Sequence, residues 1–148
     1  MPRISVNDIH NISKTALVQH GALDWISEEV SDAVAASESV GNRICGLYYL
    51  ESYCEQLLSG RVNGQASPDV QLVRPGAIYV DADDGFAQPA FSKGLPEALK
   101  LAKENGIASL SVGHAHTCTS LGYFTKKIAE SGFLGLGLTN ASPIVAPP

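Results

Sequence analysis

Two histidines, a cysteine and several hydroxyl side chains gather in one short stretch, residues 109–124 (S-L-S-V-G-H-A-H-T-C-T-S-L-G-Y-F). A short apolar segment opens this stretch, and a helical pattern follows it. The free N–H groups at a helix N-terminus favour an anion or a phosphate, and they tend to keep a nearby imidazole neutral. These residues are therefore the first candidate for an active site, and a nucleotide would suit it.

A metal site is the alternative chemistry for the same stretch. His114, His116 and Cys118 alternate along the chain, so an extended segment would place them on one side. Three ligands at such positions rarely surround a zinc ion without a distant fourth. We therefore expect hydrogen-bonded loop histidines and no metal. His10 and His20 fall in the first helical pattern and are interpreted as surface or packing residues.

Composition narrows the class of protein. The chain has 148 residues, is 45% hydrophobic and 17% charged, and can bury one substantial core. A net charge of -5 argues against nucleic acid and anionic membranes as partners, because both require clustered Lys and Arg. Three cysteines without C-x-x-C spacing, and the absence of an apolar leader or membrane span in the sequence, predict a cytoplasmic protein.

The first 60 residues have helical periodicity. A capping box at Ser5 and Asp8 opens the first pattern, which Gly21 ends. The second pattern begins between Asp24 and Ser27 and ends at Gly41, and the third runs through Leu47 to Leu58. We expect residues 1–60 to form a helical layer that binds substrate or supports dimerisation.

The rest of the chain predicts an α/β segment. Residues 61–76 are rich in turn signals and are expected to be an extended connector without a regular element. Residues 77–148 are expected to contain strands over 77–81, 107–112 and 133–138, with a helix through Leu95, Leu99 and Ala102 and another over 119–130. This β-α-β-α-β order implies a parallel or mixed sheet covered by helices.

Ligands of such sheets bind beyond the carboxyl ends of the strands. The turn over 113–119 and the segment over 140–143 both follow expected strands, so both can face one crevice. The sequence contains neither G-x-G-x-x-G nor a Walker motif. A bound nucleotide would therefore be held without the Rossmann fingerprint.

Several stretches together resemble the type II malate/L-lactate dehydrogenase family, which includes ureidoglycolate dehydrogenase and the Δ1-piperideine- and Δ1-pyrroline-2-carboxylate reductases. The shorter stretches are 60–63 (G-R-V-N), 80–82 (V-D-A), 85–90 (G-F-A-Q-P-A), 106–108 (G-I-A) and 122–124 (G-Y-F). The last stretch runs from Gly132 to the N-A-S-P of residues 140–143, and A-P follows at 146–147. The neighbourhoods of 85–87 and 116–118 most resemble the cyclic-imine reductases. The resemblance implies NAD(P)H-dependent reduction of a 2-oxo acid or cyclic 2-imino acid, in a homodimer with a nucleotide domain that is not a Rossmann fold.

Two catalytic positions of the family differ in this chain. Family members carry Ser-His-Gly, with an Arg three residues after the Gly, at the turn into the third helix, where the pair is expected to hold the substrate carboxylate and to help proton transfer. Here Cys45 takes the place of the His and Tyr49 that of the Arg. An Arg binds a carboxylate through two charge-assisted hydrogen bonds, whereas a tyrosine offers one neutral donor. Weaker substrate binding is the expected consequence.

The proton-donating histidine of the family aligns without gaps to Thr117, one residue after His116. A threonine hydroxyl has no pKa near neutrality, so it is no general acid. Either His116 takes this role through a rotated turn, or Thr117 holds a water molecule. The cofactor is expected to be NADP or NAD, with Ser120, Leu121, Asn140 and Ala141 as its binding residues.

By this resemblance the chain is also shorter than the family members and corresponds to less than half of the length of one. Two hypotheses follow. The first is an oxidoreductase for a 2-oxo or 2-imino acid such as Δ1-pyrroline-2-carboxylate. The second is a truncated, non-catalytic remnant or dimerising module that keeps the fold, and the missing length favours it for the activity of these residues alone.

Overall fold

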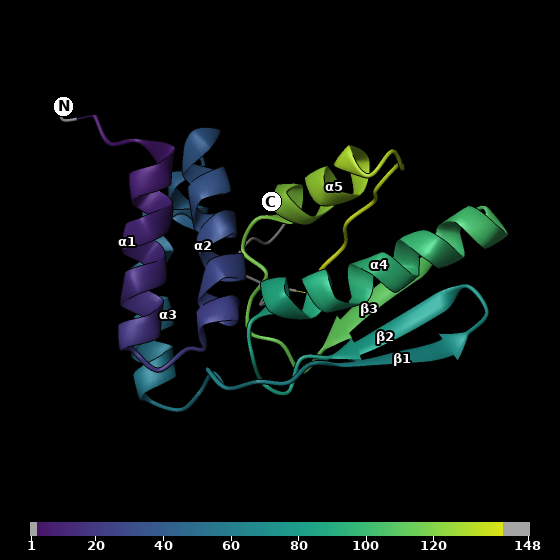
Figure 1. Ribbon diagram of the computed structural model, residues 1–148, viewed down its shortest axis with the longest axis horizontal. Helices are drawn as coiled ribbons and strands as arrows, with labels where there is room; N and C mark the ends of the chain where they lie inside the picture. The colour runs from purple at the N-terminus through teal and green to yellow at the C-terminus, as the bar shows by residue number, and fades with distance from the viewer. Residues whose placement is uncertain (1–2, 141–148) are drawn as a thin grey trace, which may run out of the picture.

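The computed structural model describes residues 3–140, which form a helical layer beside a small sheet with its own helices (Figure 1). The helical layer consists of α1 (Val6–Gln19), α2 (Asp24–Ser39), a short 3-10 turn η1 (Arg43–Cys45) and α3 (Leu47–Leu58). The expected capping box is confirmed, because the backbone N–H of Asp8 donates to Ser5 Oγ at 3.0 Å. Gly21 follows α1 with a φ of 98°, a conformation that favours glycine.

The three helices enclose one apolar core. Its members from α1 and α2 include Leu17, Ile26 and Val30, and α3 adds Tyr53. Several small residues of α2 are buried, and the hydroxyl of buried Ser31 donates to the Ser27 carbonyl at 2.6 Å. Figure 1 shows α1 and α2 running antiparallel, as their short connection requires.

The sheet has three strands in the order β1-β2-β3 and is mixed, in agreement with the expected class. Its strands are β1 (Asp69–Arg74), β2 (Ala77–Asp81) and β3 (Ser109–Gly113). β1 pairs antiparallel with β2, and β2 pairs parallel with β3. β1 corrects the expectation of an irregular connector over 61–76. All six of its residues are exposed on the sheet edge, so burial gives this strand no apolar signature.

α4 (Ala87–Asn105) crosses from β2 to β3 and covers one face of the sheet. The helix begins earlier than the periodicity indicated and contains Pro96, whereas Gly106 ends it with a φ of 81°. Gly94 allows the close contact with the sheet. A Cβ at that position would lie 2.6 Å from Val80 Cγ2 and 2.7 Å from Leu110 Cδ1.

α5 (Leu121–Glu130) starts two residues later than expected and packs Tyr123 and Phe124 against α4 and Ala33 of α2. The expected final strand over 133–138 is wrong, because residues 134–140 have no regular structure. Gly135 and Gly137 rest against α5, and the intervening leucines point outward. No strand of the described part pairs with this segment, so its alternating leucines and glycines do not form part of a sheet there.

Within residues 3–140, none of the helices is both long enough and apolar enough to cross a membrane.

Candidate active site

The segment 114–120 leaves the carboxyl end of β3 and passes between the helical layer and the start of α4. His114 and Thr119 have positive φ values of 48° and 55°, which bend the segment at both ends. Between these bends the His116 N–H donates to the Gly85 carbonyl at 2.8 Å, and a parallel bridge joins His116 to Phe86. The stretch that first suggested chemistry is thus held against the turn before α4.

His116 packs against two aromatic rings, Tyr53 and Phe86, which also contact each other with ring centroids 5.2 Å apart. The Tyr53 and Phe86 ring centroids each lie 5.8 Å from its imidazole, and both rings meet it edge to face. Its Nδ1 is buried without a hydrogen-bond partner. Burial, and then the positive charge of Arg61, lower the pKa of His116 below its usual 6.5. The ring is therefore neutral at pH 7, and the cause is burial, whereas the sequence suggested the N–H groups of a helix N-terminus.

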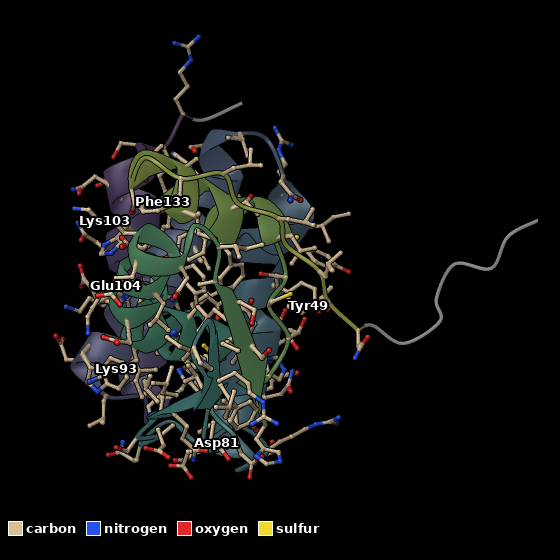
Figure 2. The ribbon with its side chains drawn as sticks, turned by 90° about the vertical axis from the view of Figure 1, so that its right-hand side faces the viewer. Tyr49, Asp81, Lys93, Lys103, Glu104 and Phe133 are labelled. Carbon is tan, nitrogen blue, oxygen red and sulfur yellow. The ribbon has the colours of Figure 1, made fainter. Side chains whose placement is uncertain are left out.

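Tyr53 links His116 to the start of the third helix. Its hydroxyl donates to Thr119 Oγ1 at 3.4 Å, and burial raises its pKa to about 12, so it remains a neutral donor. Tyr49 lies one helical turn earlier, with its ring centroid 5.7 Å from that of Tyr53. The structure thereby places the predicted residues Tyr49 and His116 on either side of Tyr53. Tyr49, from α3, and Asp81, at the end of β2, are labelled in Figure 2.

Cys45 and Thr117 border this group differently. Cys45 is half-buried at the end of η1, and its charged form would raise the pKa of Tyr53, so it belongs to the same neighbourhood. Thr117 is exposed, and its hydroxyl accepts only from the Thr119 N–H, at 3.4 Å. Of the two candidate proton carriers, His116 is the one that faces the aromatic group on α3.

Glu38 defines the turn into α3. Its carboxylate accepts from the Leu47 N–H at 2.9 Å and so caps the N-terminus of α3 from α2. The side chain passes directly over Gly46, where a Cβ would clash with it. The Cys45–Gly46 turn therefore already has an anion at its helix N-terminus.

The candidate cofactor residues lie at the opposite end of the segment. Ser120 is the N-cap of α5 and Leu121 its first residue, and neither a side-chain cap nor an acidic first-turn residue occupies this terminus. Cys118 Sγ donates to Thr139 Oγ1 at 3.6 Å, which brings the exposed Asn140 near the same loop. Ala141 lies outside the described residues. An uncapped helix N-terminus fits a phosphate group, and nucleotide binding by these residues stays a prediction.

The three alternating side chains His114, His116 and Cys118 do not converge. His114 turns to Asp81 and forms an ion pair with it at 2.8 Å, whereas His116 packs inward. The positive φ of His114 breaks the extended geometry on which the alternation argument depended.

Sequence reasoning missed three residues of this site: Tyr53, Gln88 and Arg61. Tyr53 was interpreted as helical packing, although it follows Tyr49 at the i, i+4 spacing that places two side chains on one face. Gln88 is 1% exposed, with its Nε2 3.5 Å from the Cys118 carbonyl and its Oε1 unpaired. Arg61 has no pattern in the sequence that ties it to His116, because only the fold brings them together.

The fold and site define an α/β protein with a neutral, half-buried histidine and an open helix N-terminus beside it. Residues 4–148 match the family described as malate/L-lactate dehydrogenase, and the chain belongs to this family. The expectation from the sequence motifs is confirmed.

Individual relatives include reductases and dehydrogenases. The chain is 28% identical over 145 residues to the Δ1-pyrroline-2-carboxylate/Δ1-piperideine-2-carboxylate reductase of Pseudomonas putida, covering 98% of this chain and 42% of that protein. It is 31% identical to the (2R)-3-sulfolactate dehydrogenase (NADP(+)) of Chromohalobacter salexigens, covering 97% and 43%. The chain thus spans less than half the length of these relatives.

Solved structures agree with the fold. The Δ1-piperideine-2-carboxylate reductase of Pseudomonas syringae superposes with a TM-score of 0.85 at 26% identity, over 89% of this chain and 40% of that one. A malate dehydrogenase of Pyrococcus horikoshii gives 0.82 at 23% identity, over 88% and 38%.

Proposed function

We propose that the chain belongs to an NAD(P)H-dependent oxidoreductase that reduces a 2-oxo acid or a cyclic 2-imino acid such as Δ1-pyrroline-2-carboxylate. The observation that supports this proposal most is the neutral, half-buried His116, which lies between the α3 aromatic group and the uncapped N-terminus of α5. The membership of the family supports the class of reaction. The reductase and dehydrogenase names of the relatives favour this proposal over a non-catalytic remnant.

The nucleotide would be held by Ser120 and Leu121 at the start of α5, with Asn140 and Ala141 from the following segment. When bound, NADH or NADPH supplies the hydride that reduces the substrate carbon. The N–H groups at the start of α5 would bind a phosphate without a competing side chain. The 133–140 segment runs back beside α5 and would form the second wall.

His116 would carry the proton that the reduced oxygen or nitrogen requires. Since its pKa is lowered below 6.5, the free protein holds this proton less readily than an ordinary histidine does. Reduction by the free enzyme should therefore become faster as the pH falls below 6.5. Tyr53 and Phe86 both meet the ring edge to face, and these two contacts would orient the imidazole.

Arg61 would bind the substrate carboxylate, to which Tyr49 offers only one neutral hydrogen-bond donor. Its charge already acts on His116, so a negative substrate group near Arg61 would raise the pKa of His116 and help it to hold a proton. Cys45 would then border the substrate without taking part in proton transfer. We further propose a cytoplasmic homodimer.

Nucleotide binding is the direct test. NADPH and NADH are titrated into the protein with and without Δ1-pyrroline-2-carboxylate, and nucleotide fluorescence is followed. We expect saturable binding of one of the two nucleotides and its oxidation when the imino acid is added. Absence of binding to either nucleotide would contradict the proposal.

Two substitutions then separate the candidate proton carriers. His116→Gln should lower the rate of reduction by about 100-fold or more, the usual contribution of a general acid. Thr117→Val is the matched neighbour and should change the rate by less than about 10-fold. A larger loss of rate in Thr117→Val than in His116→Gln would assign proton donation to Thr117.

A further inference from the structure

A cluster of metal-ligand side chains lies on α1 and α2 and includes none of the residues of the candidate active site. His10 comes from α1, and Glu28 and Asp32 come from α2 at i, i+4 spacing. Their ligand atoms lie within 4.8 Å of one another. All three residues line a groove of about 710 Å³ between α1, α2 and α5. Sequence reasoning treated His10 as a surface or packing residue and expected no metal.

The two distances from His10 Nε2 to the carboxylates are those of ligands that share an ion. His10 Nε2 lies 3.4 Å from Glu28 Oε1 and 3.3 Å from Asp32 Oδ1. In a tetrahedral zinc site with bonds of ~2.0–2.1 Å, neighbouring ligand atoms lie ~3.3–3.4 Å apart. A charge-assisted N–H···O hydrogen bond is shorter, at ~2.7–2.9 Å.

A hydrogen bond does not account for the position of His10 Nε2 either. The atom is buried and has no hydrogen-bond partner, although two carboxylate oxygens face it. A cation between the three atoms would satisfy the ring nitrogen and both oxygens together. The side chain of His10 is 18% exposed, so the α1–α2 contact fixes the position of its ring.

The neighbouring lysines leave the ligand atoms free. Lys14 Nζ lies 2.8 Å from Glu28 Oε2, which is the other oxygen of that carboxylate. This contact orients Glu28 with Oε1 toward His10, as outer-shell partners of metal ligands do. On the α5 side, Lys127 pairs with Glu29 at 3.4 Å and Lys126 with Glu130 at 3.6 Å.

We propose that His10, Glu28 and Asp32 bind one divalent transition-metal ion, with zinc as the best match, and that the ion joins α1 to α2. One imidazole and two carboxylates are a ligand set that zinc accepts, and the groove leaves its remaining position to water. Both carboxylates come from one helix and the imidazole from its neighbour, an arrangement that helical bundles use for metals.

Zinc titration by calorimetry, with a chromophoric chelator as competitor, tests this proposal. The wild-type protein should bind one zinc ion per chain at this site, and His10→Gln should weaken that binding by at least about 10-fold. At zinc of about 100 times Kd the Tm of the wild type should rise by about 5 °C or more. The same shift should be absent in His10→Gln.

Two control variants exclude other zinc ligands. His20→Gln removes a histidine from the end of the same helix, and Cys118→Ser removes a thiol of the candidate active site. Both should bind zinc as the wild type does. Cobalt gives a second readout, because a four-coordinate site of oxygen and nitrogen ligands shows visible absorption without the thiolate charge-transfer band. This absorption should disappear in His10→Gln.

If metal-free His10→Gln does not fold, as judged by far-ultraviolet circular dichroism, Asp32→Asn is tested in its place. The same loss of zinc affinity is expected for it. Equal zinc affinity in the wild type and the folded variant would overturn the proposal. So would loss of zinc binding in Cys118→Ser alone, or no binding by the wild type.

Discussion

Two histidines only two positions apart lie in opposite electrostatic surroundings. His114 is exposed and pairs with Asp81, which raises its pKa, whereas burial lowers the pKa of His116. Asp81 in turn has a lowered pKa, first because it accepts from the Asp83 N–H and then because of His114. The turn at His114, with its positive φ, sends one ring outward and the other inward.

We expect the two rings to titrate on opposite sides of 6.5, which NMR of the imidazole resonances measures directly. Asp81→Asn should lower the pKa of His114 and leave that of His116 unchanged.

The pH dependence of stability follows from the same pKa shifts. The ion pair between His114 and Asp81 should stabilise the fold below pH 6.5, until Asp81 itself takes up a proton. This stabilisation should be lost as the pH rises through the raised pKa of His114. The contribution of neutral His116 to the stability of the fold is fully present above pH 6.5 and decreases as the pH falls toward the lowered pKa of His116. Equal pKa values for the two rings would contradict this description.

Arg61 gives a second prediction at the scale of a single residue. Arg61→Gln should raise the pKa of His116, because it removes the nearby positive charge. In the active enzyme it should raise KM for the substrate by about 10-fold or more while changing kcat less, as loss of carboxylate binding does. Arg43→Gln, on η1, is the matched control. An unchanged KM with Arg61→Gln would remove Arg61 from the substrate site.

At the scale of the elements, two helical glycines differ in what surrounds them. Gly94 of α4 lies against β2 and β3, where a Cβ would come within 2.7 Å of side-chain atoms. Gly122 of α5 has only Ser120 Oγ nearby, at 3.7 Å. The first therefore serves packing, whereas the second has room for a methyl group.

Gly94→Ala should lower the free energy of unfolding by about 1–3 kcal/mol, because overpacking forces the helix away from the sheet. Gly122→Ala is the matched control and should raise it by up to about 1 kcal/mol through helix propensity. Urea unfolding measures both. A neutral Gly94→Ala would mean that α4 moves from the sheet without cost.

At the scale of the whole molecule, the segment after α5 presents its apolar side to solvent. Leu134, Leu136 and Leu138 are 101%, 85% and 85% exposed. Three such leucines in one extended segment form an apolar strip, and strips of this kind favour association.

We expect the chain to self-associate as its concentration increases, measured by analytical ultracentrifugation. Changing the three leucines to serine should reduce this association, because it removes the apolar strip. Leu58→Ser, at a single residue 70% exposed at the end of α3, is the control and should have little effect. Undiminished association in the triple variant would place the contact elsewhere, with the exposed strand β1 as the next candidate.

The sequence determined the local parts of this protein. Ser5 and Asp8 start α1, and Gly21 and Gly106 end helices with positive φ values, because these signals act within one turn of the chain. Family motifs likewise identified the family, which the match over residues 4–148 confirms. Such features depend on neighbours in the chain, so the order of residues is sufficient to predict them.

Only the tertiary structure decided the remaining features. β1 is a strand because β2 lies beside it, and residues 133–138 lack strand structure because no segment among residues 3–140 pairs with them. His116 is neutral because Tyr53 and Phe86, distant in sequence, exclude water from it. The approach of His10 to Glu28 and Asp32 depends on how α1 packs against α2. Burial, strand pairing and contacts between elements are properties of neighbours in space, which the order of residues does not specify.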